Sequence, residues 1–527
     1  MSKLKDHPKR IFPLDALWIP LAILVCLLIA GYSLWYTSVG KFPVFPVIGK
    51  HNYYVDLGES FLHGQLSLPE EPNPQLIALK NPYSYQQREH VPYQFDYSYY
   101  RGKYYLYWGP VPGLVLAGIE RLTHTRPPNS LMTIISYIGL SFLILIILIQ
   151  LKNQFFPAGP GPSLIIFLLS GLVNIPFLFL LGRTEIYETS IIAGQFFLFF
   201  GLLSWMIYTR TAKSIWLTIA GLGWGLALGS RYNLAISILF FVGFITIWIW
   251  YEDKRRHFWN KLCLLLVPLA ACALGLGLYN FARFGNPLET GLTYQLTQPI
   301  QHFYLVAYIP SNLYSYFLSP MTVVNKFPFI KVSLFSNKFL PSWLRLSAIS
   351  SGKQFDSVMM GLLLSSPITC LLALGIPLAV LLRPLYFRYR PTSSRRFAFF
   401  AIILIAAVAQ IMYLLIFFYG AMRYLADFYL LLILTVVMLV WRMDEMLQSK
   451  PKIRICFWIV VAGLGIWTAA IGFFGGFDIP PQLLRNYNPV LYSHLESSWN
   501  NYYQDIKVIV DALWLPKILH FIFHSVG

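Results

Sequence analysis

Apolar segments, most of them close to 20 residues long, alternate with polar connections along this chain. About 20 apolar residues in a helix cross the hydrocarbon core of a bilayer. The pattern therefore predicts an all-α polytopic membrane protein with about 11 transmembrane helices. The predicted spans are 17–37, 129–151, 162–181, 188–208, 215–230, 233–250, 262–281, 357–382, 397–419, 425–441 and 455–474.

Two of the polar connections are long, and both fall on the same side of the predicted bundle. We expect one transmembrane domain over residues 1–474, with a first outer loop at 38–128 and a second at 282–356. Residues 111–124 are apolar but too short to span, so they predict a helix lying in the membrane interface. We expect residues 475–527 to form an outer tail or interfacial helices. A twelfth transmembrane span near the end of the chain is the alternative.

Composition and charge support the same class. Of the 527 residues 57% are hydrophobic and 12% are charged, well below the quarter that is usual in soluble domains. The net charge of +18 comes from clusters between spans, namely "MSKLKDHPKR", "YEDKRRHFWNK", "RPLYFRYRPTSSRR" and "WRMDEMLQSKPKIR". Such clusters mark cytoplasmic connections. The charge therefore indicates orientation, with the N-terminus inside and the tail outside, rather than nucleic-acid binding.

Four arginines break this charge rule, because they stand at the outer ends of predicted spans. They lie in "GRTEIYE", "GSRYN", "YNFARFGNP" and "GAMRYLAD", and are Arg183, Arg231, Arg283 and Arg423. A guanidinium binds phosphate oxygens in pairs and keeps its charge, so an anionic lipid phosphate would explain all four. Alternatively each arginine extends to lipid headgroups or pairs with a nearby acid.

Acidic residues that could support or neutralise these arginines stand close by in the sequence. Glu185 and Glu188 follow Arg183, Glu289 follows Arg283, and Asp427 follows Arg423. The last pair has the i, i+4 spacing of a salt bridge along one helix.

The first outer loop holds candidate catalytic acids. The stretch "HNYYVDLGESFLHGQLSL" predicts a short amphipathic helix with Asp56, Glu59 and His63 on one flank. Desolvation near the membrane raises the pKa of a carboxyl while an arginine keeps it ionised, which suits a general base. Asp96 lies among seven tyrosines and a tryptophan between residues 93 and 108, a composition suited to stacking on sugars. Alternatively these acids are solvated surface groups.

No cofactor is expected. The five cysteines lie in apolar segments without ligand spacing, which predicts neither a disulfide nor a zinc site. The two long loops lack an Asp-x-Asp motif, so a metal ion is not expected either.

The chain resembles the GT-C superfamily of membrane glycosyltransferases, especially the protein O-mannosyltransferase and lipid A aminoarabinose transferase group. The resemblance covers residues 15–440 and includes "YYVDLGESFLHGQL", "DYSYYRGKYYLYWGPVPGLVLAGIERLTH", "GRTEIYE", "RFGNPLETG" and "RYLAD". It implies an outer-face site, a polyprenyl-phosphate sugar as donor, and a glycan, lipid or protein as acceptor. It makes Asp56 the base that deprotonates the acceptor hydroxyl, and arginines the groups that stabilise the departing phosphate. Relatives often have an adjacent Asp-Glu pair, whereas Leu57 and Gly58 separate Asp56 from Glu59 in this chain. Asp96 and Glu59 therefore remain alternatives for the base.

Two other function classes fit part of the pattern. A transporter or flippase for a lipid-linked or anionic substrate would use the same arginines, but it predicts ionisable residues near mid-membrane, where these spans have almost none. A non-catalytic scaffold would use the large outer loops to hold partners. The expected location is a bacterial cytoplasmic membrane, with the site facing the periplasm or exterior.

Overall fold

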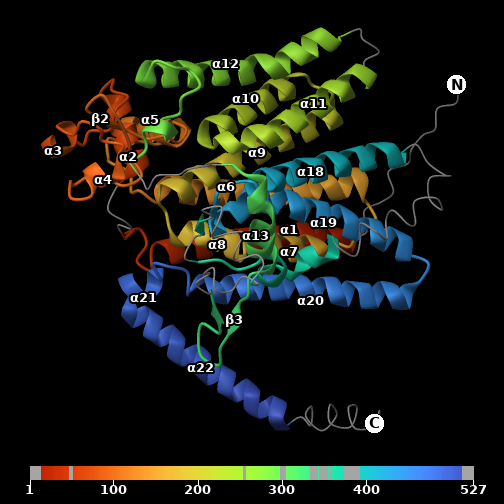
Figure 1. The fold of residues 1–527 in the computed structure, drawn as a ribbon. Helices are drawn as coiled ribbons and strands as arrows, with labels where there is room; N and C mark the ends of the chain where they lie inside the picture. The colour runs from red at the N-terminus through yellow and green to blue at the C-terminus, as the bar shows by residue number, and fades with distance from the viewer. Residues whose placement is uncertain are drawn as a thin grey trace.

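The computed structural model describes residues 13–46, 52–252, 257–296, 304–332, 342, 354–355, 358–372 and 392–512. These residues form a bundle of long helices that run roughly side by side (Figure 1). In this part of the chain eight helices are long and apolar enough to cross a membrane. The protein is therefore an all-α polytopic membrane protein, as its hydrophobic pattern predicted.

Most predicted spans coincide with helices of the bundle. The long helices are α1 (Pro13–Thr37), α6 (Leu131–Phe155), α9 (Ile186–Thr211), α10 (Ile215–Ser230), α11 (Ala235–Glu252), α12 (Phe258–Phe284), α18 (Thr392–Leu415), α19 (Ala426–Leu447) and α20 (Pro451–Gly476). α19 lies at the centre, where its most apolar stretch is wholly buried. α12 lies at the periphery, with only 6% of its apolar stretch buried within the protein.

The predicted span 162–181 is broken. It consists of α7 (Ser163–Leu172) and α8 (Ile175–Gly182), which meet at an angle of 47°. Asn174 begins α8 by accepting a hydrogen bond from the backbone N–H of Phe177 at 3.1 Å. Its amide also donates to the Gly171 carbonyl at 2.8 Å, so the groups freed by the break are satisfied.

The predicted span 357–382 is not a continuous helix in its described part. Residues 358–372 contain α15 (Leu362–Ser365) and a 3₁₀ turn, Pro367–Thr369, with an interruption at Ser366. Pro367 explains the interruption, because proline disfavours helical conformation in the residue before it and has no N–H to donate. The remainder of this predicted span lies outside the described residues.

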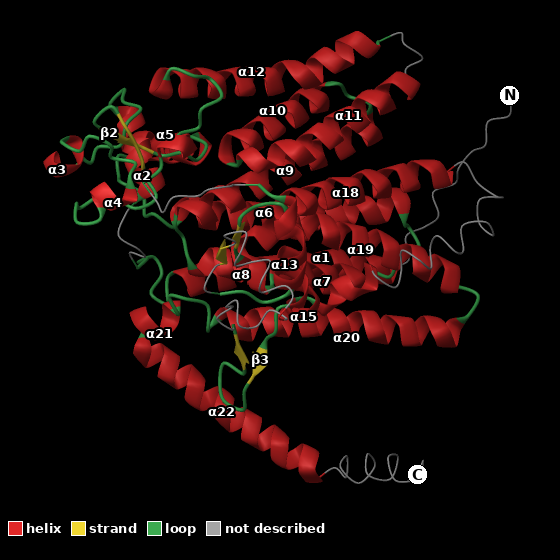
Figure 2. Cartoon of the chain, viewed as in Figure 1, coloured by secondary structure: helices red, strands yellow, loops and turns green. Residues whose placement is uncertain are grey.

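The short strands connect loops and do not build a core (Figure 2). β1 (Ser98–Tyr100) and β2 (Lys103–Tyr105) are antiparallel, as are β3 (Thr322–Val323) and β4 (Ile330–Lys331). β5 (Gln354–Phe355) and β6 (Tyr419–Gly420) are parallel. The β1–β2 hairpin belongs to the first outer loop, together with α2 (Tyr53–Leu62), α3 (Pro74–Ile77), α4 (Tyr85–Arg88) and α5 (Val111–Thr123).

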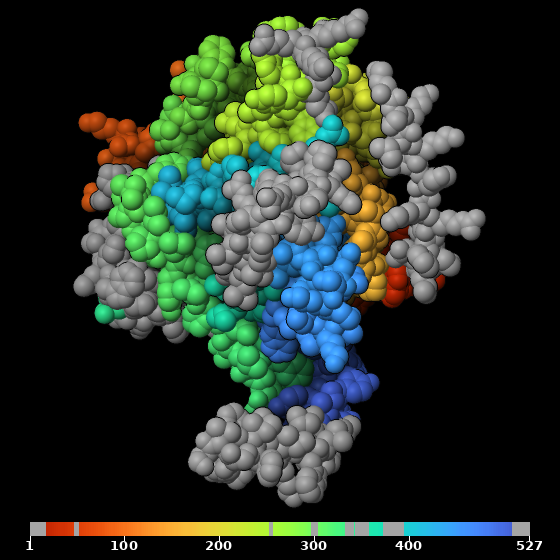
Figure 3. Space-filling model, turned by 90° about the vertical axis from the view of Figure 1, so that its right-hand side faces the viewer, coloured from red at the N-terminus to blue at the C-terminus, as the bar shows by residue number. Residues whose placement is uncertain are grey.

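The first outer loop gathers at one end of the bundle, and the basic connection between α19 and α20 lies at the other (Figure 1). Figure 3 views the opposite end, where α19 turns into α20. Lys450, Lys452 and Arg454 lie at this turn. The separation agrees with the predicted division of the connections between two sides.

Close backbone contacts hold the first outer loop on the helices. A Cβ on Gly109, just before α5, would lie only 2.0 Å from the carbonyl oxygen of Gly229 near the end of α10. α2 in turn packs against α5, where a Cβ on Gly58 would lie 3.0 Å from the Gly113 carbonyl oxygen. Residues 111–124 thus form the predicted helix, and its membrane-interface position stays a prediction.

The tail continues with α21 (Leu483–Tyr487) and α22 (Pro489–Ala512), and α22 runs obliquely past α20 (Figure 1). α22 is too polar to count among the candidate spans. Residues 513–527, which include most of the possible twelfth span, lie outside the described residues.

Candidate active site

Two of the predicted arginines meet around one buried carboxylate at the loop-bearing end of the bundle. Arg183 follows α8, Glu188 lies in the first turn of α9, and Arg423 lies in a 3₁₀ turn, Met422–Leu425, before α19. Glu188 Oε1 is 4.0 Å from Arg183 Nε and 3.7 Å from Arg423 Nη1, and its side chain is fully buried. These distances exceed hydrogen-bond length. Glu188 therefore balances charge between two guanidiniums without holding either in hydrogen-bond geometry.

Aromatic rings surround the Arg423 guanidinium. Its central carbon lies 4.3 Å from the ring centre of Tyr187, 5.4 Å from that of Tyr424 and 5.7 Å from that of Tyr419. Cation–π contacts of this kind stabilise a guanidinium with little bulk water around it. Arg423 is only slightly exposed, so its charge is fixed at a defined place.

Asp96 lies beside this group. The side-chain amide of Gln295 donates to Asp96 Oδ1 at 3.1 Å. Burial raises the pKa of the Asp96 carboxyl, while a hydrogen bond from Tyr187 and the charge of Arg423 act to lower it. Tyr187 also shares a hydroxyl–hydroxyl hydrogen bond of 2.6 Å with Tyr107. Asp96 has a φ of 65°, a left-handed conformation that Asp adopts more readily than most residues.

Asp56 has a different set of partners. Arg126, just after α5, donates from Nη2 to Asp56 Oδ1 at 2.5 Å, and its Nη1 lies 3.0 Å from Glu59 Oε2. Side-chain exposure is 20% for Asp56 but 49% for Arg126, so this ion pair borders solvent. Burial raises the pKa of Asp56, the positive charge of Arg126 lowers it, and Glu59 raises it. Asp56 and Glu59 share a flank of α2, as predicted.

A pair of tyrosine rings relates the two acids of the first outer loop. The rings of Tyr53 and Tyr97 are 5.4 Å apart, edge to face. The charge of Asp96 contributes to a raised pKa of Tyr53, and the charge of Asp56 to a raised pKa of Tyr97, with burial the larger cause in both. The charges of Asp56 and Asp96 therefore each raise the pKa of one member of the same tyrosine pair.

Arg231 lies in the short turn between α10 and α11, as predicted, but it pairs with an acid far away in the sequence. Its Nε and Nη2 donate to the two oxygens of Asp427 at 3.2 and 2.7 Å, and both side chains are buried. Asn233 adds a third hydrogen bond to Asp427 at 2.9 Å. The guanidinium also lies over Trp108 of the first outer loop, 4.9 Å from the ring centre.

The expected salt bridge between Arg423 and Asp427 is therefore wrong. Arg423 lies in the 3₁₀ turn that precedes α19, whereas Asp427 lies in the first turn of α19. The i, i+4 spacing places two residues on one face only when both belong to the same α-helix. Here the acid turns to Arg231, and Arg423 faces Glu188.

Arg283 is held by two backbone carbonyls and by the side chain of Asn280. It donates to the Leu106 carbonyl, to Asn280 Oδ1 at 2.7 Å and to the Thr290 carbonyl at 3.5 Å. The expected pairing of Glu289 with Arg283 is not observed. Helix α12 ends at Phe284 with Gly285 as its C-cap. The Glu289 carboxylate instead accepts from the Gly291 N–H and the Thr293 hydroxyl, both at 2.7 Å. Arg283 thus ties the end of β2 to α12.

The site contains residues that the sequence did not single out. Arg126, Tyr187, Asn233, Gln295 and Tyr424 all contact the predicted acids or arginines. The sequence does offer a signal for Arg126, because it is a basic residue of the first outer loop just after the predicted interfacial helix. Among the described residues no group of three His, Cys, Asp or Glu side chains could hold a metal ion, and the expectation about metal stays a prediction.

Comparison with known proteins gives structural matches only. No protein-family model matches the chain, and no curated protein does. The oligosaccharyltransferase AglB from Archaeoglobus fulgidus, in complex with an inhibitory peptide and a dolichol-phosphate, is 13% identical, with a TM-score of 0.45 over 88% of this chain and 56% of its own. ArnT from Cupriavidus metallidurans, bound to undecaprenyl phosphate, is 12% identical, with a TM-score of 0.41 over 89% of this chain and 77% of its own.

Both matches have TM-scores below 0.5 and identities of 13% or less, so they carry no argument about the fold or function of this chain. The chain spans little more than half the length of the oligosaccharyltransferase. TM-scores below 0.5 at this identity transfer neither a substrate nor a site residue to this chain.

Proposed function

We propose that this protein is a membrane glycosyltransferase that moves a sugar from a polyprenyl-phosphate carrier to an acceptor hydroxyl. One observation supports the proposal above all others. Arg183 and Arg423, from segments 240 residues apart, meet at the end of the bundle that also holds Asp56 and Asp96. Fixed cations and carboxylates beside tyrosine rings are the groups that transfer from a lipid phosphate requires.

Arg183 and Arg423 are proposed to bind the leaving phosphate. The planar guanidinium matches phosphate oxygens, and donors fixed before the reaction stabilise charge as it develops. Glu188 lies between the two cations and reduces their mutual repulsion before a phosphate binds. Arg231 and Arg283 are assigned to holding the walls of the site, because Arg231 pairs with Asp427 and the two Nη groups of Arg283 donate to Asn280 and to backbone carbonyls.

Asp56 is proposed as the general base. In a direct displacement the acceptor oxygen attacks the anomeric carbon from the side opposite the phosphate. Its proton passes to the carboxylate, and the electron pair of the breaking C–O bond leaves with the phosphate. Asp96 is close to Arg423, on the phosphate side, whereas Asp56 faces the solvent-bordering side with Arg126. The positive charge of Arg126 favours the ionised carboxylate that a base requires.

The test is sugar transfer in proteoliposomes supplied with polyprenyl-phosphate sugars and a mixture of hydroxyl acceptors. Arg423→Gln should lower the rate by roughly 10²–10³-fold, the effect of losing one fixed donor to a developing anion. Arg210→Gln, an exposed arginine at the opposite end of the bundle, is the matched control and should retain full activity. Equal rates in the two variants would contradict the proposal. Movement of the lipid across the membrane without any glycosidic product would support the flippase alternative.

A further inference from the structure

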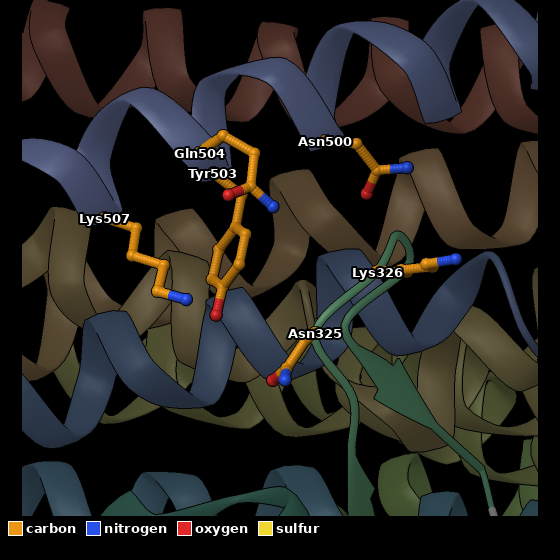
Figure 4. Close-up of a pocket in the computed structure, with 6 residues that line it drawn as sticks. All are labelled: Asn325, Lys326, Asn500, Tyr503, Gln504 and Lys507. Atoms are coloured by element: carbon orange, nitrogen blue, oxygen red, sulfur yellow. The ribbon is translucent and has the colours of Figure 1, made fainter.

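A polar pocket lies away from the candidate active site, between the β3–β4 hairpin and α22 (Figure 4). Its volume is about 260 Å³. Of the described residues six line it, two from the tip of the hairpin and four from the helix: Asn325, Lys326, Asn500, Tyr503, Gln504 and Lys507.

The helix contributes one continuous face to this pocket. Asn500, Tyr503, Gln504 and Lys507 have the spacing i, i+3, i+4 and i+7, which places four side chains on the same side of an α-helix. Figure 4 shows the Tyr503 ring reaching toward Asn325, with the Lys507 ammonium and the Gln504 amide beside it. The α22 face turned toward the hairpin tip therefore carries polar groups at this level.

The hairpin wall is held firmly against α20 and α22. Asn500 Oδ1 accepts a hydrogen bond from the Phe327 N–H at 2.8 Å, which fixes the amide orientation and turns its N–H₂ group elsewhere. The Phe327 ring packs 5.0 Å from that of Phe477, and the Phe329 ring lies 5.3 Å from Phe474 and 5.5 Å from Tyr503. These aromatic contacts preorganise the pocket before any ligand binds.

The chemistry of the lining selects an anion with polar substituents. Lys326 and Lys507 supply two positive charges, and the amides and the Tyr503 hydroxyl supply donors and acceptors. None of the described side chains that line the pocket is acidic. Lysine binds phosphate as a point charge without a fixed geometry. We propose that this pocket binds a phosphate ester, such as the headgroup of an anionic phospholipid. Because both lysines border solvent, binding should weaken as the salt concentration rises.

The experiment uses the full-length protein in nanodiscs of phosphatidylcholine with increasing phosphatidylglycerol, and native mass spectrometry counts the bound phosphatidylglycerol. The double variant Lys326→Gln, Lys507→Gln should bind about tenfold more weakly, since hydrogen bonds to a charged group are lost at an exposed site. Lys326→Arg, Lys507→Arg keeps the charge and should bind as the wild type does. Lys450→Gln, Lys452→Gln removes two exposed charges at the opposite end of the bundle and is the control.

A second arm separates a membrane source from a soluble one. Glycerol 3-phosphate is titrated into protein held in nanodiscs of phosphatidylcholine alone. Weaker phosphatidylglycerol binding in the pocket variant than in the control supports a lipid headgroup. Binding of glycerol 3-phosphate to wild type but not to the pocket variant supports a soluble phosphate ester. If the pocket variant and the control bind both probes equally, the proposal is wrong.

Discussion

Asp56 and Asp427 each pair with an arginine at the same end of the bundle, yet their surroundings differ. Asp56 lies on a short helix of the first outer loop, and its partner Arg126 is half exposed. Asp427 and Arg231 are separated by 196 residues and are both buried, with two mutual hydrogen bonds. The Asp56–Arg126 pair is open to water. The Asp427–Arg231 pair holds the start of α19 against the turn before α11, and Arg231 also contacts Trp108 of the first outer loop.

The difference in burial also predicts a difference in energy. A charge taken out of water depends on its partner, so removing one member of a buried pair leaves an uncompensated charge. An exposed pair has water as an alternative partner and contributes little to stability. The two arginine–carboxylate pairs should therefore respond in opposite ways to substitution, the buried pair in stability and the exposed pair in reaction chemistry.

The largest stability effect is expected at the buried pair. Asp427→Ala should lower the free energy of unfolding by about 3–5 kcal/mol, because Arg231 stays buried without its counter-charge. Thermal unfolding of the protein in detergent measures the change. The double variant Arg231→Met, Asp427→Leu removes both charges and should recover most of the loss. A single variant as stable as wild type would show that water reaches Arg231.

A smaller effect is expected in the pH dependence of transfer. Asp56 must be ionised to accept a proton, so the rate should fall as the pH falls through the raised pKa of this carboxyl. Arg126 lowers that pKa, so Arg126→Gln should move the acidic limb of the rate profile to higher pH. Rates from pH 4 to 8 in proteoliposomes are the measurement. An unmoved limb would separate Asp56 from the rate-determining proton transfer.

The smallest effect is expected from the same substitution on stability. Arg126 is 49% exposed, so its ion pairs with Asp56 and Glu59 are screened by water. Arg126→Gln should change the free energy of unfolding by less than about 1 kcal/mol. Its unfolding curve should superimpose on that of wild type in the same detergent. A loss comparable to that of Asp427→Ala would mean that the two pairs are equally structural.

The helices could be predicted from the sequence because lipid imposes a simple length and polarity rule. The exceptions have local causes. Asn174 breaks one apolar run by starting a new helix, and Pro367 explains the interruption of another at Ser366. The positions of the outer loops followed from the basic connections between spans. Their internal folds, such as the β1–β2 hairpin, depend on contacts that hydrophobic periodicity does not encode.

The site was predictable in its residue types and only partly in its pairings. Arg183 and Arg423 could be singled out because they stand at the outer ends of predicted spans, where a charge is costly unless it is paired or faces a polar cavity. Sequence proximity then suggested Asp427 for Arg423 and Glu289 for Arg283, and both pairings failed. The positions of helix ends decide such contacts, because the 3₁₀ turn before α19 and the end of α12 at Phe284 redirect these side chains. Arg126 was missed because its contact with Asp56 spans 70 residues.

The central claim is that Asp56 takes the acceptor proton while Asp96 lies on the phosphate side of the same site. The direct test compares Asp56→Asn with Asp96→Asn in transfer from a polyprenyl-phosphate sugar, at equal amounts of folded protein. Asp56→Asn should lower the rate by roughly 10²–10⁴-fold, the usual contribution of a general base, and Asp96→Asn should have a much smaller effect. Undiminished transfer by Asp56→Asn, or a larger loss in Asp96→Asn, would contradict the account.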